Sequence, residues 1–595
     1  MKKEVIERLR GLRAIMRREH LAAFIFPSTD PHNSEYVPEH WKGREWITGF
    51  NGSAGTAVVT MTGAALWTDS RYFIAAADQL AGTEYRLMRM GVPDTPAISD
   101  WLGEQLKSSD VTEIGLDGSV NSYAFVRQLE ADMRKRGGIT VRTNFDPLNE
   151  LWKNRPAVPK NKVTLQPLQY AGERTCHKIE RIRQALRAQH ADGTIVSALD
   201  DIAWILNLRG NDVHCNPVFV SYLVISTTKA TLYIDPEKLT PDAVSYLATE
   251  GIEIRNNADI IKERCDYHEY NILLDPHQLN FNIYQAPRTA EKIVAPSPVS
   301  ALKAVKNEAE IEGFRHAMER DGVAMVRFLK WLKPAVEAGG QTEMSVDKKL
   351  TDLRAEQPLF KGRSFDSIVG YEAHGAIVHY QATADTDTKL EPRGLILIDT
   401  GAQYQDGTTD ITRTIALGPI TDEQRKIYTL VLKGHIQLEL CKFLSGACGS
   451  QLDVLARQAM WREGFNFMHG TGHGVGSYLN VHEGPHQIRM EWKPAPLLAG
   501  MTVTDEPGIY LEGKFGVRIE NTLLVTCYKK TDFGTFLQFE PLTLAPIDTT
   551  PILLDMLLPE EREWLNGYHA TVYKRLSSHL DNEEKAWLYK MTAPL

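Results

Sequence analysis

The segment LILIDTGAQYQDGTTD, residues 395–410, runs from an apolar strand into Asp399 and reaches a second acid, Asp410, eleven residues later. The turn-forming residues 403–407 between them predict that the chain folds back and sets the two carboxylates side by side. An acid that closes a buried strand needs a partner, because an unpaired buried carboxylate is protonated or unfolds its surroundings. For Asp410 alone, a surface hairpin with two acids would be the simpler interpretation.

A second hairpin follows at VTDEPGIY and GVRIENTLLV, residues 503–510 and 516–525, with its turn expected at 513–514. Glu506 and Glu520 are fourteen positions apart and are expected to face each other across it. Pro507 forces an extended backbone at Glu506. A solvent-facing salt bridge between Arg518 and Glu520 is the alternative, but it does not explain why acids interrupt apolar strands in two separate hairpins.

Between the hairpins, HGTGHGVGSYLNVHEGP at 469–485 places His469, His473 and His482 among five glycines. Glycine lets the backbone approach a ligand closely, so the imidazoles are expected to project into a cleft. A single histidine would more often be structural, whereas three within fourteen residues favour a functional site.

Four carboxylates and one imidazole carry too much negative charge to be buried without cations. We therefore expect a pair of divalent ions, held by these ligands: Asp399, Asp410, His473, Glu506 and Glu520. An oxygen-rich site with no thiolate favours Mn²⁺, and Co²⁺, Fe²⁺ or Zn²⁺ would also bind. Two such ions suit hydrolysis, because they share a hydroxide and stabilise a tetrahedral oxyanion.

The remaining composition narrows the class of protein. The formal net charge of −9 argues against a nucleic-acid-binding surface, and no apolar run approaches the ~18 residues of a membrane span. The first 20 residues have apolar positions at helical spacing, which predicts an amphipathic helix and not a signal peptide. Six scattered cysteines without CxxC spacing indicate free buried thiols in a reducing cytoplasm.

The chain of 595 residues is too long for one core, and its pattern divides it into three blocks at 1–158, 159–301 and 302–595. The second block repeats the order of the first, which is helix, strand, polar loop and then a strand pair, so two related α/β domains are expected. The third block opens with a long helical pattern at 303–332 and carries the chemistry. Its tail from about 545, with a helix at 560–576, is expected to pack on that block without taking part in catalysis.

These motifs resemble the "pita-bread" metallopeptidases, and in particular the long, three-domain cytosolic type of Xaa-Pro aminopeptidase (aminopeptidase P). The order of the five candidate ligands carries the resemblance, as do the following segments: GAIVHY at 375–380, FNGSAGTAVVT at 50–60, LWTDSRYF at 66–73, RGNDVHCNPVF at 209–219, and 541–566 in the tail. The resemblance implies two α/β domains like the creatinase N-terminal domain, followed by an α+β catalytic domain. It also implies a homodimer, and peptides with an N-terminal Xaa-Pro as substrates.

The resemblance further implies a role for each residue. Asp399 and Asp410 would hold one metal ion, and Asp410 would also reach the second. His473, Glu506 and Glu520 would complete the ligands of the second metal ion, and Glu520 would bridge the two ions. Glu506 would also act as the general base. His379 and His482 would hold the substrate and steady the tetrahedral intermediate, His469 would line the proline pocket, and Arg518 would hydrogen-bond within the network.

Three other functions are weighed against this one. A prolidase would use the same metals on Xaa-Pro dipeptides, whereas the additional upstream domain and the spacing between His473 and His482 favour aminopeptidase P. A non-catalytic pita-bread binding protein would have lost metal ligands, and all five are present here. A creatinase-type amidinohydrolase shares the fold but would not need this ligand set.

Overall fold

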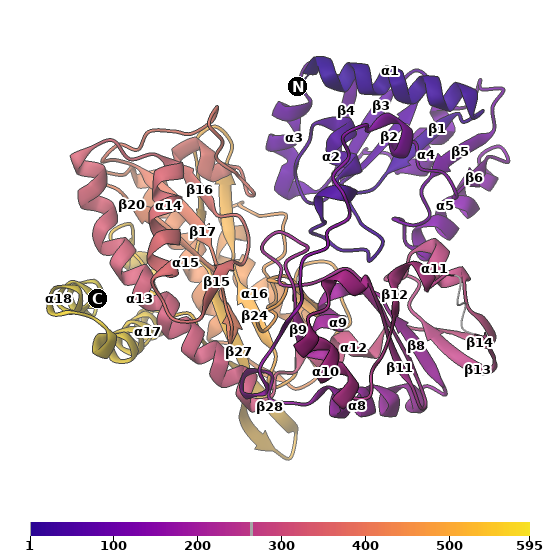
Figure 1. Cartoon of the computed structure of the whole chain (residues 1–595). Helices are drawn as coiled ribbons and strands as arrows, with labels where there is room; N and C mark the ends of the chain where they lie inside the picture. The colour runs from indigo at the N-terminus through magenta and orange to yellow at the C-terminus, as the bar shows by residue number, and fades with distance from the viewer. Residues whose placement is uncertain (1, 262–265) are drawn as a thin grey trace. The chain divides into compact units, whose positions relative to one another are not determined.

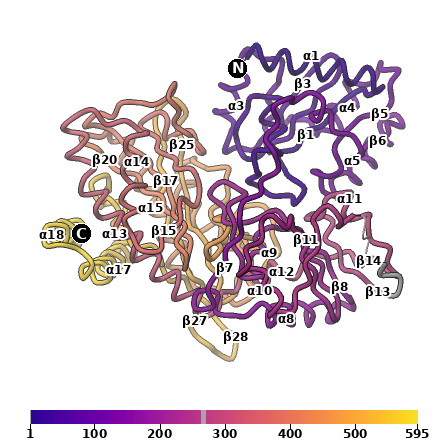
Figure 2. The backbone as a smooth tube through the Cα atoms, viewed as in Figure 1, coloured from indigo at the N-terminus to yellow at the C-terminus, as the bar shows by residue number. Residues whose placement is uncertain are grey.

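The computed structural model describes residues 2–261 and 266–595, and the chain divides into two compact units. Unit 1 consists of Met1–Leu165 and Glu173–Val299, and unit 2 of Gln166–Gly172 and Ser300–Leu595. Unit 1 runs from indigo to magenta in Figure 1, and unit 2 runs from rose to yellow apart from its short purple segment at 166–172. The smooth backbone trace of Figure 2 follows the same course.

The first domain of unit 1 is a six-stranded sheet in the order β4-β3-β2-β1-β5-β6. The predicted amphipathic helix forms as α1 (Lys2–Arg18), and its buried Val5, Leu9, Leu12 and Met16 pack on this sheet. The antiparallel pairs β1–β2 and β2–β3 are followed by parallel pairs at both edges. The strands are β1 (Ala23–Phe26), β2 (Thr56–Thr60), β3 (Ala64–Thr68), β4 (Tyr85–Arg89), β5 (Glu113–Leu116) and β6 (Thr140–Arg142).

The second domain of unit 1 repeats this topology strand for strand. Its sheet has the order β12-β11-β10-β8-β13-β14, with parallel and antiparallel pairs at the matching places. Its first helix is α8 (Thr175–Ala188), which corresponds to α1. The strands are β8 (Gly193–Val196), β10 (Ser221–Ser226), β11 (Ala230–Ile234), β12 (Glu253–Asn256), β13 (Asp266–Leu274) and β14 (Arg288–Val294). The predicted pair of related α/β domains is thereby confirmed.

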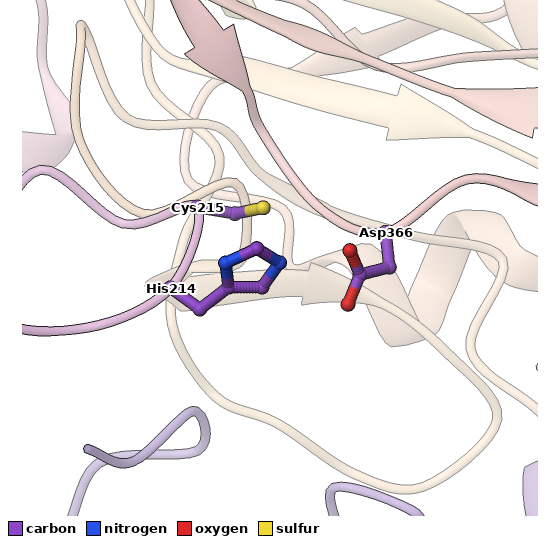
Figure 3. Close-up of side chains that lie close together, drawn as sticks. All are labelled: His214, Cys215 and Asp366. Carbon is purple, nitrogen blue, oxygen red and sulfur yellow. The ribbon is translucent and has the colours of Figure 1, made fainter. Parts of the chain in front are cut away.

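The motif at 209–219 forms the loop that follows β9 (Leu208–Arg209). Asp212 anchors the loop, because its buried carboxylate contacts Lys238 Nζ and accepts a hydrogen bond from the Val220 N–H at 2.7 Å. His214 and Cys215 follow on the same loop. Figure 3 draws their side chains, and also that of Asp366, which follows β15 (Phe360–Arg363) in unit 2.

Unit 2 places long helices against several small sheets. Val323 and Val326 of α13 (Glu308–Ala338) share one buried cluster with Ile427 and Val431 of α15 (Asp422–Glu439). The candidate ligands lie on or beside strands of several small sheets, among them β16-β17-β20, β21-β28-β27-β24 and β22-β23. Two further helices complete this part, α14 (Glu343–Ala355) and α16 (Gly449–Trp461).

The helix predicted at 303–332 has different ends in the structure. Residues 303 and 304 belong to the preceding helix α12 (Pro298–Ala304). Helix α13 begins only at Glu308 and continues to Ala338 through Pro334. The break arises at Asn307, whose side chain accepts a hydrogen bond from the Glu310 N–H at 3.0 Å while Glu310 accepts from the Asn307 N–H at 3.1 Å. This reciprocal cap starts a new helix where the apolar spacing alone suggested continuity.

The C-terminal tail forms α17 (Pro559–Leu576) and α18 (Asn582–Met591). Leu565, Val572 and Leu576 of α17 lie in the same buried cluster as α13 and α15, which confirms that the tail packs on this unit. No helix among the described residues is long and apolar enough to cross a membrane.

The predicted free thiols are present at the five described cysteines, but the expectation that they are buried is wrong for most of them. Cys448 is buried, Cys527 on β27 (Asn521–Thr531) is exposed, and the other three are half-buried. Cys265 lies outside the described residues.

Candidate metal centre

The first pair of acids lies where two strands of one hairpin pass each other. Asp399 is on β17 (Leu395–Thr400), and Asp410 immediately precedes β20 (Ile411–Ala416), which pairs antiparallel with β17 so that Asp399 faces Thr412. Two short strands, β18 (Ala402–Tyr404) and β19 (Gly407–Thr408), form the predicted turn. Both acids are buried, at 7% and 3% exposure.

The close approach at the turn requires a glycine. A Cβ atom added to Gly401 would lie 2.0 Å from the Thr409 carbonyl oxygen, a distance that no side chain can occupy. A glycine at this position therefore allows the chain to bring Asp410 beside Asp399.

The second pair of acids lies at a break between two ladders. Strand β24 (Thr502–Asp505) pairs with β27 so that Asp505 faces Asn521. Strand β25 (Gly508–Leu511) pairs with β26 (Phe515–Arg518) so that Gly508 faces Arg518. Glu506 and Glu520 occupy the gap between these ladders, one on each strand of the hairpin, as expected from the sequence.

His473 joins the two pairs of acids. It lies on β22 (Gly472–Gly474), and its Nε2 atom is 3.5 Å from Asp410 Oδ2 and 3.5 Å from Glu506 Oε1. Its Nδ1 atom lies 2.9 Å from the Gly474 carbonyl oxygen, which can only accept a hydrogen bond. The proton is therefore on Nδ1, and the Nε2 lone pair points to the acids, as a metal ligand requires.

The ligating atoms of Asp410, His473 and Glu520 all lie within 4.8 Å of one another, and each can reach a common ion. Glu520 is held from behind by the Thr412 hydroxyl, which donates to Glu520 Oε2 at 2.7 Å. Such a hydrogen bond fixes the direction of a ligating carboxylate.

The electrostatics of this cluster call for cations. Burial raises the pKa of Asp410 well above its usual range, and the charges of Asp399 and Glu506 raise it further. The pKa of Glu520 is raised in the same way, first by burial and then by Asp410 and Asp399. Among the described residues Asp399 Oδ1 accepts no hydrogen bond. The donor set of four carboxylates and one imidazole fits two divalent ions, which would restore charge balance without protonating the acids.

Arg518 does not form the solvent-facing salt bridge with Glu520 that was the alternative interpretation of this hairpin. It is 1% exposed, and its Nη2 donates to Asp399 Oδ2 at 2.7 Å. Its Nη1 donates to the Tyr510 hydroxyl at 2.6 Å, and that oxygen is 2.8 Å from His469 Nε2. A hydrogen-bonded chain thus leads from a candidate ligand to a histidine that we assigned to the substrate pocket.

Tyr510 was missed by the sequence analysis. It has no polar pattern around it, and only the tertiary structure places its hydroxyl between Arg518 and His469. Burial raises its pKa, so the phenol stays neutral and is able to donate.

The two remaining histidines also lie near the centre. The His482 and His473 rings are 4.4 Å apart between centroids and nearly perpendicular, at 77°. His379 follows Val378, whose carbonyl oxygen accepts a hydrogen bond from Arg518 Nη2 at 3.3 Å. The structure therefore brings all of the predicted site residues into one region of unit 2.

Comparison with protein-family models divides the chain into four consecutive matches. Two of them are to the creatinase/prolidase N-terminal domain, at residues 8–145 and 154–310. Residues 312–527 match metallopeptidase family M24, and residues 535–595 match the C-terminal region of peptidase M24.

Curated proteins and solved structures match over nearly the full length. Aminopeptidase P1 of Arabidopsis thaliana is 37% identical over 100% of this chain and 99% of that protein, and a probable Xaa-Pro aminopeptidase P of Botryotinia fuckeliana is 39% identical over 99% and 93%. The crystal structure of X-prolyl aminopeptidase from Caenorhabditis elegans, a cytosolic enzyme with a di-nuclear active site, has a TM-score of 0.94 at 34% identity and covers 99% of this chain and 100% of that one. An Xaa-Pro dipeptidase from Bacillus anthracis, at 27% identity and a TM-score of 0.52, covers 64% of this chain and 100% of that one.

Proposed function

The chain belongs to the Xaa-Pro aminopeptidase P branch of metallopeptidase family M24, and from this premise we propose that it uses two divalent metal ions to release the N-terminal residue from peptides with proline in the second position. The observation that carries the proposal is the convergence of Asp399, Asp410, His473, Glu506 and Glu520 on one cluster, in a chain that matches these aminopeptidases from end to end.

Each residue of the centre has a proposed task. Asp399 and Asp410 would hold one metal ion, Asp410 and Glu520 would be shared by both, and His473 and Glu506 would complete the ligands of the second. When bound, two divalent ions supply an activated water and stabilise the negative charge that develops on the peptide carbonyl. Glu506 would serve as the general base for that water, and His379 and His482 would donate hydrogen bonds to the substrate.

The proline pocket is assigned to His469. The Tyr510 hydroxyl and Arg518 fix the orientation of its ring from behind, as described above. A pyrrolidine ring has no N–H to satisfy, so an apolar ring face against it suits the substrate better than a hydrogen-bonding wall. We propose Mn²⁺ as the metal, because oxygen ligands predominate and no thiolate is present in the cluster.

The prolidase alternative is less well supported. The dipeptidase from B. anthracis aligns with 64% of this chain, whereas the C. elegans aminopeptidase aligns with 99% of it. The extra α/β domain therefore belongs with the aminopeptidase branch.

A comparison of four peptides tests the proposal. With Mn²⁺ present, the purified protein should release arginine from Arg-Pro-Pro, and should leave Arg-Ala-Ala and acetyl-Arg-Pro-Pro uncleaved. The alanine peptide leaves the pocket part-filled and its amide N–H without a partner, and acetylation removes the charged amine. Rapid cleavage of Arg-Pro but not of Arg-Pro-Pro would establish the prolidase instead, and equal cleavage of all four would indicate a general peptidase.

We also propose that the protein is a cytoplasmic homodimer. The C. elegans relative is described as cytosolic, and the five described cysteines of the present chain form no disulfide. Several exposed apolar side chains belong to unit 2, on α16 and in the segments that follow α16 and β23: Val454, Trp461, Met468, Met490 and Trp492. A second copy would cover these side chains, and light scattering should then give twice the chain mass of 66.9 kDa.

A further inference from the structure

A second group of ionisable side chains lies directly behind the candidate metal centre. His435 and Glu439 are one turn apart on α15, and Asp505 ends β24. His435 Nδ1 is 3.1 Å from Asp505 Oδ2, and His435 Nε2 is 3.2 Å from Glu439 Oε1. The three side chains are 0–2% exposed.

These three groups could reach a common ion, but the geometry favours a different role. The two carboxyl groups lie at opposite nitrogens of the ring, and the two nitrogens point in divergent directions. One ion cannot be bound through both. The ring instead forms a bridge from α15 to β24 and β27: its Nδ1 donates to the Asp505 main-chain carbonyl oxygen at 3.3 Å, and its Nε2 lies beside Glu439 and Asn521. Burial lowers the pKa of His435 to about 4 and raises the pKa of Glu439 to about 7.

The bridge is connected to two candidate metal ligands through the main chain. Asp505 immediately precedes Glu506, and Asn521 immediately follows Glu520. Asp505 and Asn521 are direct partners in the β24–β27 ladder. The Asn521 side-chain Nδ2 donates to Glu439 Oε1 at 2.9 Å and lies 3.3 Å from His435 Nε2. One imidazole therefore contacts both of the residues that flank Glu506 and Glu520.

Arg413 holds the other side of this connection. Its Nη1 donates to the Glu520 carbonyl oxygen at 2.6 Å, and its Nη2 donates to Asn521 Oδ1 at 2.9 Å. The guanidinium thereby fixes the main chain at the ligand itself as well as the side chain next to it.

The C-terminal helix covers the network from outside. The Tyr568 hydroxyl lies 2.9 Å from Arg413 Nη2, from which it accepts, and it is also 3.0 Å from the Thr543 carbonyl oxygen. Trp564 meets the His435 ring edge-on, with centroids 5.7 Å apart at 87°. Helix α17 thus keeps water from the bridge, although none of its residues is a candidate ligand.

We propose that His435 is a positioning residue for the metal centre. Through its hydrogen bond to the Asp505 main chain and its contacts with Glu439 and Asn521, it fixes the break between the two ladders from which Glu506 and Glu520 extend. The assignment rests on the proposed metal centre. Residues that orient metal ligands without binding the metal themselves typically contribute about 10–100-fold to metal affinity or activity.

The substitution His435→Phe tests this role, because it keeps a buried ring and removes both nitrogens. We expect the affinity of the metal-free protein for Mn²⁺, titrated calorimetrically, to fall about 10-fold or more. The visible spectrum of the Co²⁺-loaded protein should change, since it reports ligand geometry. The kcat value should fall more than KM rises. His435→Gln, whose amide offers a donor and an acceptor, should recover part of the affinity.

His569→Phe is the matched control. His569 is also a buried histidine, whose Nε2 accepts a hydrogen bond from the Ile547 N–H at 3.1 Å, but it contacts neither Asp505 nor Asn521. It should lower the melting temperature without changing Mn²⁺ affinity or the Co²⁺ spectrum. If His435→Phe does not fold, Tyr568→Phe tests the same network through one hydroxyl and should weaken Mn²⁺ binding by about threefold.

The outcomes separate this inference from the proposed function. A wild-type protein that binds no pair of metal ions would refute the metal centre, and the positioning role with it. A wild-type protein that binds two ions, alongside a folded His435→Phe variant with unchanged affinity and spectrum, would refute only the positioning role. Equal losses in His435→Phe and His569→Phe at matched stability would refute it as well.

Discussion

At the scale of single residues, the two carboxylate oxygens of Asp399 lie in different environments. Oδ2 accepts a hydrogen bond from Arg518 at 2.7 Å, while Oδ1 accepts none among the described residues. A buried carboxylate oxygen in this state is costly unless a cation binds it. Arg518 therefore balances part of the charge and leaves the remainder for metal ions.

The ligand assignment predicts what happens when a single oxygen is replaced. Asp410→Asn and Glu520→Gln should each lose at least one of two bound metal ions and all measurable turnover, because an amide is a much weaker ligand than a carboxylate. Elemental analysis and a peptide assay measure the two effects. Glu540→Gln, which alters an acid paired with Arg315 at the surface, should retain both ions. Two full equivalents in Asp410→Asn would contradict the two-metal centre.

The outer histidines should behave differently. His379→Ala and His482→Ala are expected to retain their metal ions and to lose about 10²–10³-fold in kcat/KM, because their donors act on bound substrate and on the developing negative charge. Metal analysis combined with steady-state kinetics separates this result from ligand loss. The exposed His579 provides the control, since His579→Ala should leave both quantities unchanged. Normal kinetics in both variants would place these histidines outside the reaction.

At the scale of elements, β26 and the short helix η5 (Glu372–Ala376) pass so closely that only glycine fits between them. A Cβ atom added to Gly516 would lie 1.8 Å from the Gly375 carbonyl oxygen. The segment that carries His379 begins just after η5, and β26 carries Arg518. This contact therefore sets the distance between two parts of the site.

Two alanine substitutions of opposite effect test that contact. Gly516→Ala must push main chain against main chain, which should destabilise the fold by about 1–3 kcal/mol and reduce activity. Gly567→Ala, on the exposed face of α17 with nothing within 4 Å, should stabilise it by about 0.5–1 kcal/mol. Chemical denaturation measures both changes. A neutral Gly516→Ala would mean that the two elements separate easily.

The sequence predicted both hairpins because acids interrupt otherwise apolar strands, and it predicted the repeated sheets from the order of elements. It did not predict the break between the β24–β27 and β25–β26 ladders, because strand pairing depends on contacts made elsewhere. The boundary between α12 and α13 was missed because one capping residue at the start of α13, Asn307, leaves the apolar spacing almost unchanged. The residues themselves did not predict the partner of Arg518, and Tyr510 was missed altogether, because the partners Asp399 and His469 are more than 40 positions away in the chain.

At the scale of the whole molecule, the candidate metal centre draws its ligands from separate sheets of unit 2, so bound metal ions would hold these sheets together. Its candidate ligands come from β17, β22 and the strand ends beside β20, β24 and β27. Metal ions that bind only the folded state stabilise it by mass action, and the gain grows with their concentration.

Removal of the metal ions should therefore destabilise the protein. At 100 times the dissociation constant, binding of one ion contributes about 2.7 kcal/mol, which corresponds to roughly 4 °C in the melting temperature of a unit of this size. Calorimetry with Mn²⁺ and with a chelator measures the shift, and renewed addition of Mn²⁺ should restore it. Identical transitions under both conditions would show that the acids are balanced without metal.

The position of the ligands along the chain also sets the order of events during synthesis. The two repeated domains emerge from the ribosome first, whereas the last ligand, Glu520, emerges only near the end. Tyr568 follows 48 residues later, and at ribosomal rates of about 5–20 residues per second that interval lasts roughly 2–10 s. During that time a nascent chain has its complete set of metal ligands but lacks the helix that covers the network behind them. Loading of the metal should thus be among the last steps in the maturation of this protein, after translation has reached α17.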